Sequence, residues 1–148
     1  LAPHVGGVDV EIRRDGSSAL IEDAHAAGAL VIGSFHDFEG TPSDDQLAEV
    51  LADMNYAGAD VLKFACTAHS ASDAARVLGA QAWAREAYDR PVIGIAMGPN
   101  GAPTRLVGSA LGSAATFATL PGAEGSAPGQ FTIEQARAVL DIVEGSEA

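Results

Sequence analysis

The 148-residue chain has little cysteine, little positive charge and no long apolar run. Cys66 is the only cysteine, so an internal disulfide is impossible, and this favours a reducing, cytoplasmic environment. Eight basic residues stand against twenty acidic ones, and the net charge of −12 disfavours binding to nucleic acid or to anionic membranes. No run approaches the roughly 20 apolar residues of a membrane helix, and the first residues lack the pattern of a signal peptide. We therefore expect a cytoplasmic protein with neither a nucleic acid nor a membrane partner.

Several cofactor motifs are also missing. No Gly-x-Gly-x-x-Gly follows the first expected strand, and no Walker A motif occurs. The four histidines and Cys66 do not have the spacing of metal ligands. We predict neither a cofactor nor a metal. His4, His25 and His69 are expected to be surface residues without partners, and Trp83, among apolar residues on a helix, is expected to be a packing residue.

The composition, 47% hydrophobic and 19% charged, is sufficient for a core, and the length fits one domain over residues 1–148. Apolar periodicity predicts five strand–helix units in strict alternation. The expected strands are 8–12, 30–35, 61–66, 91–97 and 114–119, and the helices are 20–27, 42–57, 72–88, 105–111 and 133–143. Thr41 is expected to cap the second helix, with Pro42 at its first position.

Strands that alternate with helices of this length predict a parallel sheet of the α/β class. Two architectures fit this pattern: an open doubly wound sheet, or part of a TIM barrel. A complete barrel needs about 250 residues, so this chain would supply only part of one, about five of eight units.

Polar side chains gather on one face of the expected sheet. Alternation along the strands places them opposite the apolar residues that face the helices: Asp9, Glu11, Ser34, His36 and Lys63. Asp9 and Glu11 also suit a solvated edge strand, and His36 suits a satisfied core histidine. Lys63, the only lysine, is harder to explain structurally because an unpaired buried ammonium is costly. Such lysines are often nucleophiles.

Five ordered segments resemble the type I 3-dehydroquinate dehydratase family. They are residues 34–38 (SFHDF) with 40–42 (GTP), 59–65 (ADVLKFA), Met97 followed by 105–108 (RLVG), 112–117 (GSAATF), and 126–130 (SAPGQ). The resemblance implies a (β/α)8 barrel that converts 3-dehydroquinate to 3-dehydroshikimate in the shikimate pathway of aromatic amino acid biosynthesis.

The resemblance also implies roles for individual residues. Lys63 would form a Schiff base with the C3 ketone, and His36 would remove the C2 proton and later protonate the departing C1 hydroxyl. Arg105 would hold the substrate carboxylate. The remaining expected substrate-binding residues are Ser126 and Gln130 at the ring hydroxyls, the apolar wall of Phe38, Met97, Phe117 and Ala127 that keeps the amine neutral, and Asp9 and Glu11 near the site.

The family's barrel has three further strands before the one that holds Glu11. We therefore interpret the chain as the C-terminal part of a longer barrel, a portion that should be unstable alone. Two alternatives stay open: another lysine Schiff-base barrel such as a class I aldolase, and a non-catalytic fragment that acts as an interaction module. The sequence also leaves a homodimer open.

Overall fold

The computed structural model describes residues 4–123, 125, 127 and 129–145. Its four strands are β1 (Gly7–Glu11), β2 (Leu30–Asp37), β3 (Val61–Thr67) and β4 (Val92–Met97). Its helices are α1 (Ser17–Ala26), α2 (Asp44–Tyr56), α3 (Ala71–Ala87), the short α4 (Thr104–Val107), the 3-10 turn η2 (Ser109–Leu111) and α5 (Ile133–Val143). All strand pairs are parallel, in the order β1-β2-β3-β4. The predicted α/β class and parallel sheet are confirmed.

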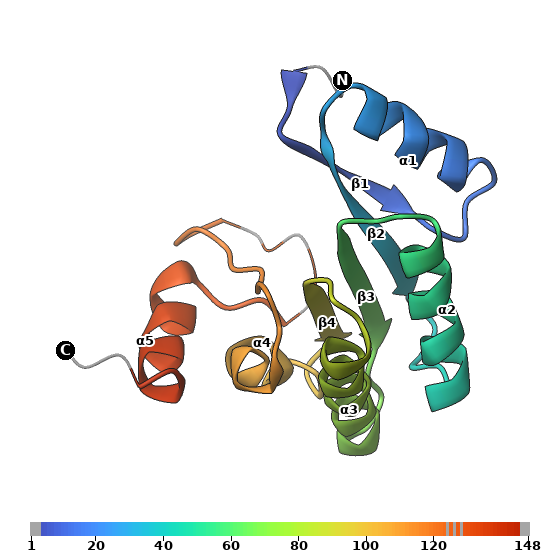
Figure 1. Cartoon of the computed structure of the whole chain (residues 1–148). Coiled ribbons are helices and arrows are strands. Elements are labelled where there is room, and N and C mark those ends of the chain that lie inside the picture. Colours follow the sequence, from blue (N-terminus) through green and yellow to red (C-terminus); the bar gives the residue numbers. More distant parts are fainter. Residues whose placement is uncertain (1–3, 124, 126, 128, 146–148) are drawn as a thin grey trace.

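The main core lies between the sheet and the helices that follow β2 and β3. Its largest fully buried members are apolar residues of α2, β3, α3 and β4, including Leu47, Leu51, Met54, Leu62, Phe64, Val77 and Val92. Figure 1 shows α1, α2 and α3 along one side of the curved sheet, whereas α4 and α5 lie beyond β4. The opposite face of the sheet is therefore the one that carries the polar strand residues predicted from the sequence.

The start of α2 differs from the prediction by two residues. Ser43, not Thr41, is the N-cap: its hydroxyl accepts a hydrogen bond from the Gln46 N–H, and the Gln46 side chain accepts one from the Ser43 N–H. Pro42 thus precedes the cap. Thr41 is used elsewhere, because its hydroxyl donates to the carbonyl of Thr67 at the end of β3.

The predicted fifth strand over 114–119 is wrong. The segment pairs with β4 at a single bridge, between Val92 and Ser113, and the Ala114 N–H donates to the Val92 carbonyl. Most of its side chains are exposed, so apolar burial does not hold it against the sheet.

Side chains occupy the edge of β4 where this strand would continue. The Leu62 N–H donates to the Pro91 carbonyl, and the Ala68 N–H donates to the Met97 carbonyl. The backbone groups of odd-numbered residues along β4 therefore point toward β3, and those of even-numbered residues point outward. The outward N–H of Gly94 donates to the Gln81 amide oxygen, and that of Ala96 donates to the Thr104 hydroxyl. The donors that a fifth strand would need are already satisfied.

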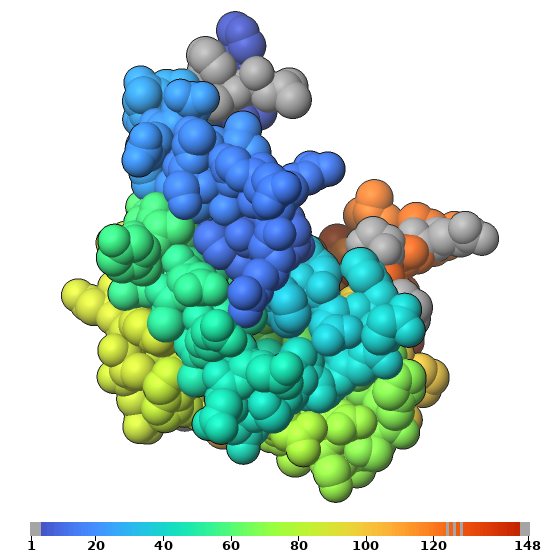
Figure 2. Space-filling model, turned by 90° about the vertical axis from the view of Figure 1, so that its right-hand side faces the viewer, coloured from blue at the N-terminus to red at the C-terminus, as the bar shows by residue number. Residues whose placement is uncertain are grey.

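The space-filling view gives the outline beside this edge. Figure 2 shows the orange segment near residue 120 projecting from the body, with an open notch between it and the blue N-terminal part.

Within the described part of the chain, no helix has the length and apolar character needed to cross a membrane.

Candidate active site

Lys63 lies in the middle of β3 on the face away from the helices and is only 9% exposed. Its Nζ donates a hydrogen bond to Asp9 Oδ2 at 2.8 Å, and it lies 5.4 Å from the centre of the Phe117 ring. The amine thus lies between an aromatic ring of the expected apolar wall and the carboxylate of Asp9, which the sequence also predicted near the site. The ion pair offsets the cost of burying the ammonium.

Asp9 connects three strands through its carboxylate. Oδ2 accepts from Lys63 on β3, and Oδ1 accepts from the Ser34 hydroxyl on β2 at 2.5 Å. Ser34 is fully buried, whereas the Asp9 side chain is 43% exposed. The carboxylate is thus oriented from inside the sheet while it keeps access to solvent.

His36 lies near the carboxyl end of β2. Its Nδ1 is 2.7 Å from Glu11 Oε2, and its ring stacks on Phe38 with centroids 5.9 Å apart. An ionised carboxylate only accepts hydrogen bonds, so Nδ1 carries the proton in this contact. In the neutral ring, Nε2 is then the nitrogen that can accept a proton.

One cavity of about 210 Å³ brings these groups together. It is lined by His36, Phe38, Lys63, Ala65, Ile95, Met97, Arg105, Phe117, Ala127 and Gln130. Besides Lys63, most of the residues predicted for the site thus lie around this one cavity. Asp9 and Glu11 stand behind it as the partners of Lys63 and His36. Ser126, the remaining expected residue, lies outside the described residues.

Arg105 reaches the cavity from α4 and is 5% exposed. Burial lowers the pKa of its guanidinium, since a low-dielectric surrounding disfavours the charged form. Its backbone carbonyl accepts a hydrogen bond from the Thr116 hydroxyl at 2.8 Å. Arg105 is thus a buried cation held at the edge of the same cavity as Lys63.

Sequence reasoning missed the partners of two histidines outside the cavity. His25 was expected to lack a partner, but its Nε2 lies 2.9 Å from Asp60 Oδ2. His69 was expected to lack one too, but its Nε2 donates to the Glu39 carbonyl at 2.8 Å. Neither pairing has a sequence pattern that predicts it, because each joins residues at least 30 positions apart.

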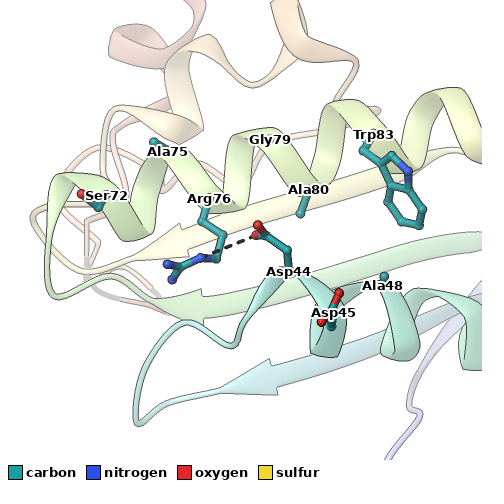
Figure 3. Close-up of a pocket in the computed structure, with 9 residues that line it drawn as sticks. All are labelled: Asp44, Asp45, Ala48, Ser72, Ala75, Arg76, Gly79, Ala80 and Trp83. Carbon is teal, nitrogen blue, oxygen red and sulfur yellow. Dashed lines mark ion pairs between the residues drawn. The ribbon is translucent and has the colours of Figure 1, made fainter.

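A larger hollow of about 660 Å³ lies outside the sheet, between α2 and α3. Figure 3 shows its lining, with Arg76 paired to Asp44 at 3.6 Å and Trp83 at one end. Trp83 is 46% exposed and contacts Tyr88 edge to face, with ring centroids 5.9 Å apart, so it packs at the surface of the molecule. None of the predicted site residues lies in this hollow, and we do not assign the chemistry to it. Within the described ranges, no group of three histidine, cysteine or acidic side chains is arranged to hold a metal ion.

The fold and the cavity define an α/β protein with a paired, buried lysine and a carboxylate-bound histidine on one face of a parallel sheet. The family model for type I 3-dehydroquinase matches residues 2–147. The chain belongs to this family.

Individual relatives agree with this assignment. A 3-dehydroquinate dehydratase of Klebsiella pneumoniae subsp. pneumoniae is 40% identical over 139 residues, which cover 92% of this chain and 55% of the relative. The 3-dehydroquinate dehydratase structure of Geobacillus kaustophilus superposes with a TM-score of 0.90 at 33% identity, covering 99% of this chain and 56% of that one. A type I enzyme of Clostridium difficile, solved with covalently modified comenic acid, gives a TM-score of 0.88 at 32% identity and covers 98% and 57%. The chain thus spans about half the length of these relatives.

Proposed function

We propose that this chain carries the lysine and histidine of a 3-dehydroquinate dehydratase, a hydro-lyase of the shikimate pathway that works through a Schiff base. The observation that carries the proposal is the cavity shared by Lys63, His36 and Arg105. An amine nucleophile, a general base and a fixed cation are the groups that a Schiff-base dehydration of a keto acid can use.

The first step is attack of the Lys63 amine on the C3 ketone, with loss of water to give a protonated imine. The ammonium must first lose a proton, and Asp9 Oδ2, at 2.8 Å, is the adjacent acceptor. The protonated imine withdraws electrons from C2, so that the C2–H bond becomes acidic. Lys63 is therefore the electrophile-forming group of the site.

The second step belongs to His36. Its Nε2 removes the C2 proton, and the electron pair forms an enamine with the imine carbon. The enamine expels the C1 hydroxyl, which leaves as water after taking the proton from His36. Hydrolysis of the new imine releases 3-dehydroshikimate and the Lys63 amine. Glu11 holds Nδ1 and stabilises the imidazolium between these transfers.

The other cavity residues would bind the substrate. Arg105 would receive the carboxylate as a bidentate pair, and its burial strengthens such a pair. Gln130, with Ser126, would bind ring hydroxyls, and four side chains would form the apolar wall: Phe38, Met97, Phe117 and Ala127. No cofactor is part of this proposal.

The wider context is also proposed. We infer that residues 1–148 act as one domain, the C-terminal part of a (β/α)8 barrel in a cytoplasmic enzyme. Coverage of about half of each relative supports a partial barrel, and the notch between the N-terminal part and the segment near residue 120 leaves space for further strands. A homodimer is compatible with this arrangement.

Borohydride trapping tests the mechanism. The full protein is mixed with 3-dehydroquinate and sodium borohydride, and intact mass and peptide mapping locate the adduct. We expect one reduced substrate-derived adduct on Lys63 and none in Lys63→Met. No adduct on folded wild-type protein would contradict the Schiff base and favour an interaction module. Trapping by sugar phosphates but not by 3-dehydroquinate would favour an aldolase-like enzyme.

A further inference from the structure

Gln81 is a fully buried polar residue with no part in the proposed chemistry. It lies on α3, on the outer side of the sheet, and its side chain bonds only to backbone groups. The amide oxygen accepts from the Gly94 N–H at 2.9 Å. The amide nitrogen donates to the carbonyls of Gly108 at 2.9 Å and Leu111 at 3.2 Å.

These bonds join β4 to the segment that carries Arg105. Gly94 is in the middle of β4, while Gly108 and Leu111 lie at the ends of α4 and η2. An isolated helix of four residues is not stable, because nucleation costs more than one turn of hydrogen bonds returns. The position of α4, and of Arg105 on it, therefore depends on bonds from outside the helix.

The contact leaves no room for another side chain. A Cβ at position 94 would lie 2.8 Å from the Gln81 amide oxygen and 2.8 Å from the Phe64 ring. Glycine at 94 thus lets the amide approach the strand edge directly. The same edge is held one step further along by Thr104, whose hydroxyl accepts from the Ala96 N–H at 3.3 Å and donates to the Gly101 carbonyl at 2.7 Å.

We propose that Gln81 is a positioning residue for Arg105: by fastening α4 to β4 from behind, it sets the affinity of the cavity for the substrate carboxylate. This inference rests on the proposed function. A guanidinium–carboxylate pair is bidentate and planar, so a small rotation of α4 weakens it more than it would weaken a point-charge contact. Lys63 and His36 sit on β3 and β2, whereas the hydrogen bonds of the Gln81 side chain go to Gly94, Gly108 and Leu111.

Gln81→Met in the full protein tests the proposal, since methionine keeps the length of glutamine and removes its hydrogen bonds. We expect KM for 3-dehydroquinate to rise roughly tenfold, the order for a weakened hydrogen bond to a charged group, with kcat nearly unchanged. Gln46→Met is the matched control: it removes the α2 capping bond at an exposed site and should leave KM unchanged.

Amide hydrogen exchange gives a readout that does not depend on turnover. In Gln81→Met, exchange should accelerate at Gly94 and over residues 104–112 and stay unchanged in β2. Accelerated exchange with unchanged KM would overturn the positioning role and leave Gln81 as a structural residue. Unchanged exchange would overturn the fastening itself. If the wild-type protein showed neither turnover nor borohydride trapping, the proposed function would be refuted instead. Amide hydrogen exchange would still show whether Gln81 fastens α4 to β4.

Gln81→Glu keeps the inference testable if the methionine variant does not fold. In its protonated form the introduced carboxyl group can donate to one carbonyl and accept from Gly94, whereas in its ionised form it would face two carbonyl oxygens. The ratio of the variant's KM to the wild-type KM should therefore rise with pH. A ratio that stays near one at every pH from 4 to 9 would contradict the proposal.

Discussion

At the scale of single residues, the candidate site consists of two acid–base pairs drawn from three consecutive strands of the sheet, β1, β2 and β3. Asp9 lies 2.8 Å from the Lys63 amine, and Glu11 lies 2.7 Å from His36 Nδ1. Both carboxylates come from β1, two residues apart, and both therefore point to the same face. One short strand thus orients both the nucleophile and the base, which accounts for the acidic alternation in its sequence.

His36→Ala should separate the two steps of the proposed reaction. Proton abstraction should slow by about 10²–10⁴-fold, the usual contribution of general acid–base catalysis, whereas imine formation by Lys63 should survive. The variant should therefore accumulate a covalent adduct that is visible by intact mass without borohydride. Single-turnover rate and melting temperature are measured together on the full protein. A lower melting temperature with an unaltered rate would leave His36 a packing residue.

At the scale of elements, side-chain caps decide where helices begin. Ser43→Ala removes the hydroxyl that accepts from the Gln46 N–H at the start of α2. We expect the unfolding free energy to fall by about 1 kcal/mol, as for other N-cap deletions. Urea titration followed by circular dichroism measures this change. Ser43→Asn should restore most of the loss because asparagine also caps, whereas equal losses in both variants would assign the cost to something other than the cap.

The elements also show what the sequence can predict. Lys63 and His36 could be found because strand alternation places them opposite residues that face helices, and that rule is local. The role of Gln81 could not be predicted from the sequence, because a glutamine among alanines on a helix resembles a surface residue. Only its hydrogen bond with Gly94, on the following strand, shows that it points inward. The fifth strand failed for the same reason, since 114–119 has suitable residues but competes with Gln81 and Thr104 for the edge of β4.

At the scale of the whole molecule, the continuous core from α2 to β4 supports one cooperative unit. We expect urea unfolding of the full protein to give the same midpoint by two probes: fluorescence of Trp83 on α3, and circular dichroism of all helices. Tryptophan reports the outer layer, and the helical signal includes α1 and α5 at both ends of the described chain. Midpoints that differ beyond error would show two independent units and contradict the single domain.

The amino ends of the strands are joined by a charge cluster that makes stability depend on pH. Partial burial opposes ionisation of Asp60, but the hydrogen bond from the Val31 N–H and the partners His25 and Arg90 outweigh it, and the pKa of Asp60 is lowered from 3.8. A carboxyl group with a lowered pKa in the folded state stabilises the fold above its unfolded value. That contribution disappears as the pH falls through the lower, folded value.

Asp60→Asn should therefore reduce the unfolding free energy at pH 6 and remove this part of the acid dependence. Asparagine can still accept from Val31, so the loss reports mainly the charge interactions with His25 and Arg90. Urea unfolding between pH 6 and pH 3 measures both proteins, and the wild-type advantage should shrink steadily toward pH 3. Arg13→Gln, which removes exposed ion pairs at α2, serves as the control and should change stability little at any pH. An advantage of wild type that stays constant with pH would show that Asp60 acts through its hydrogen bonds alone.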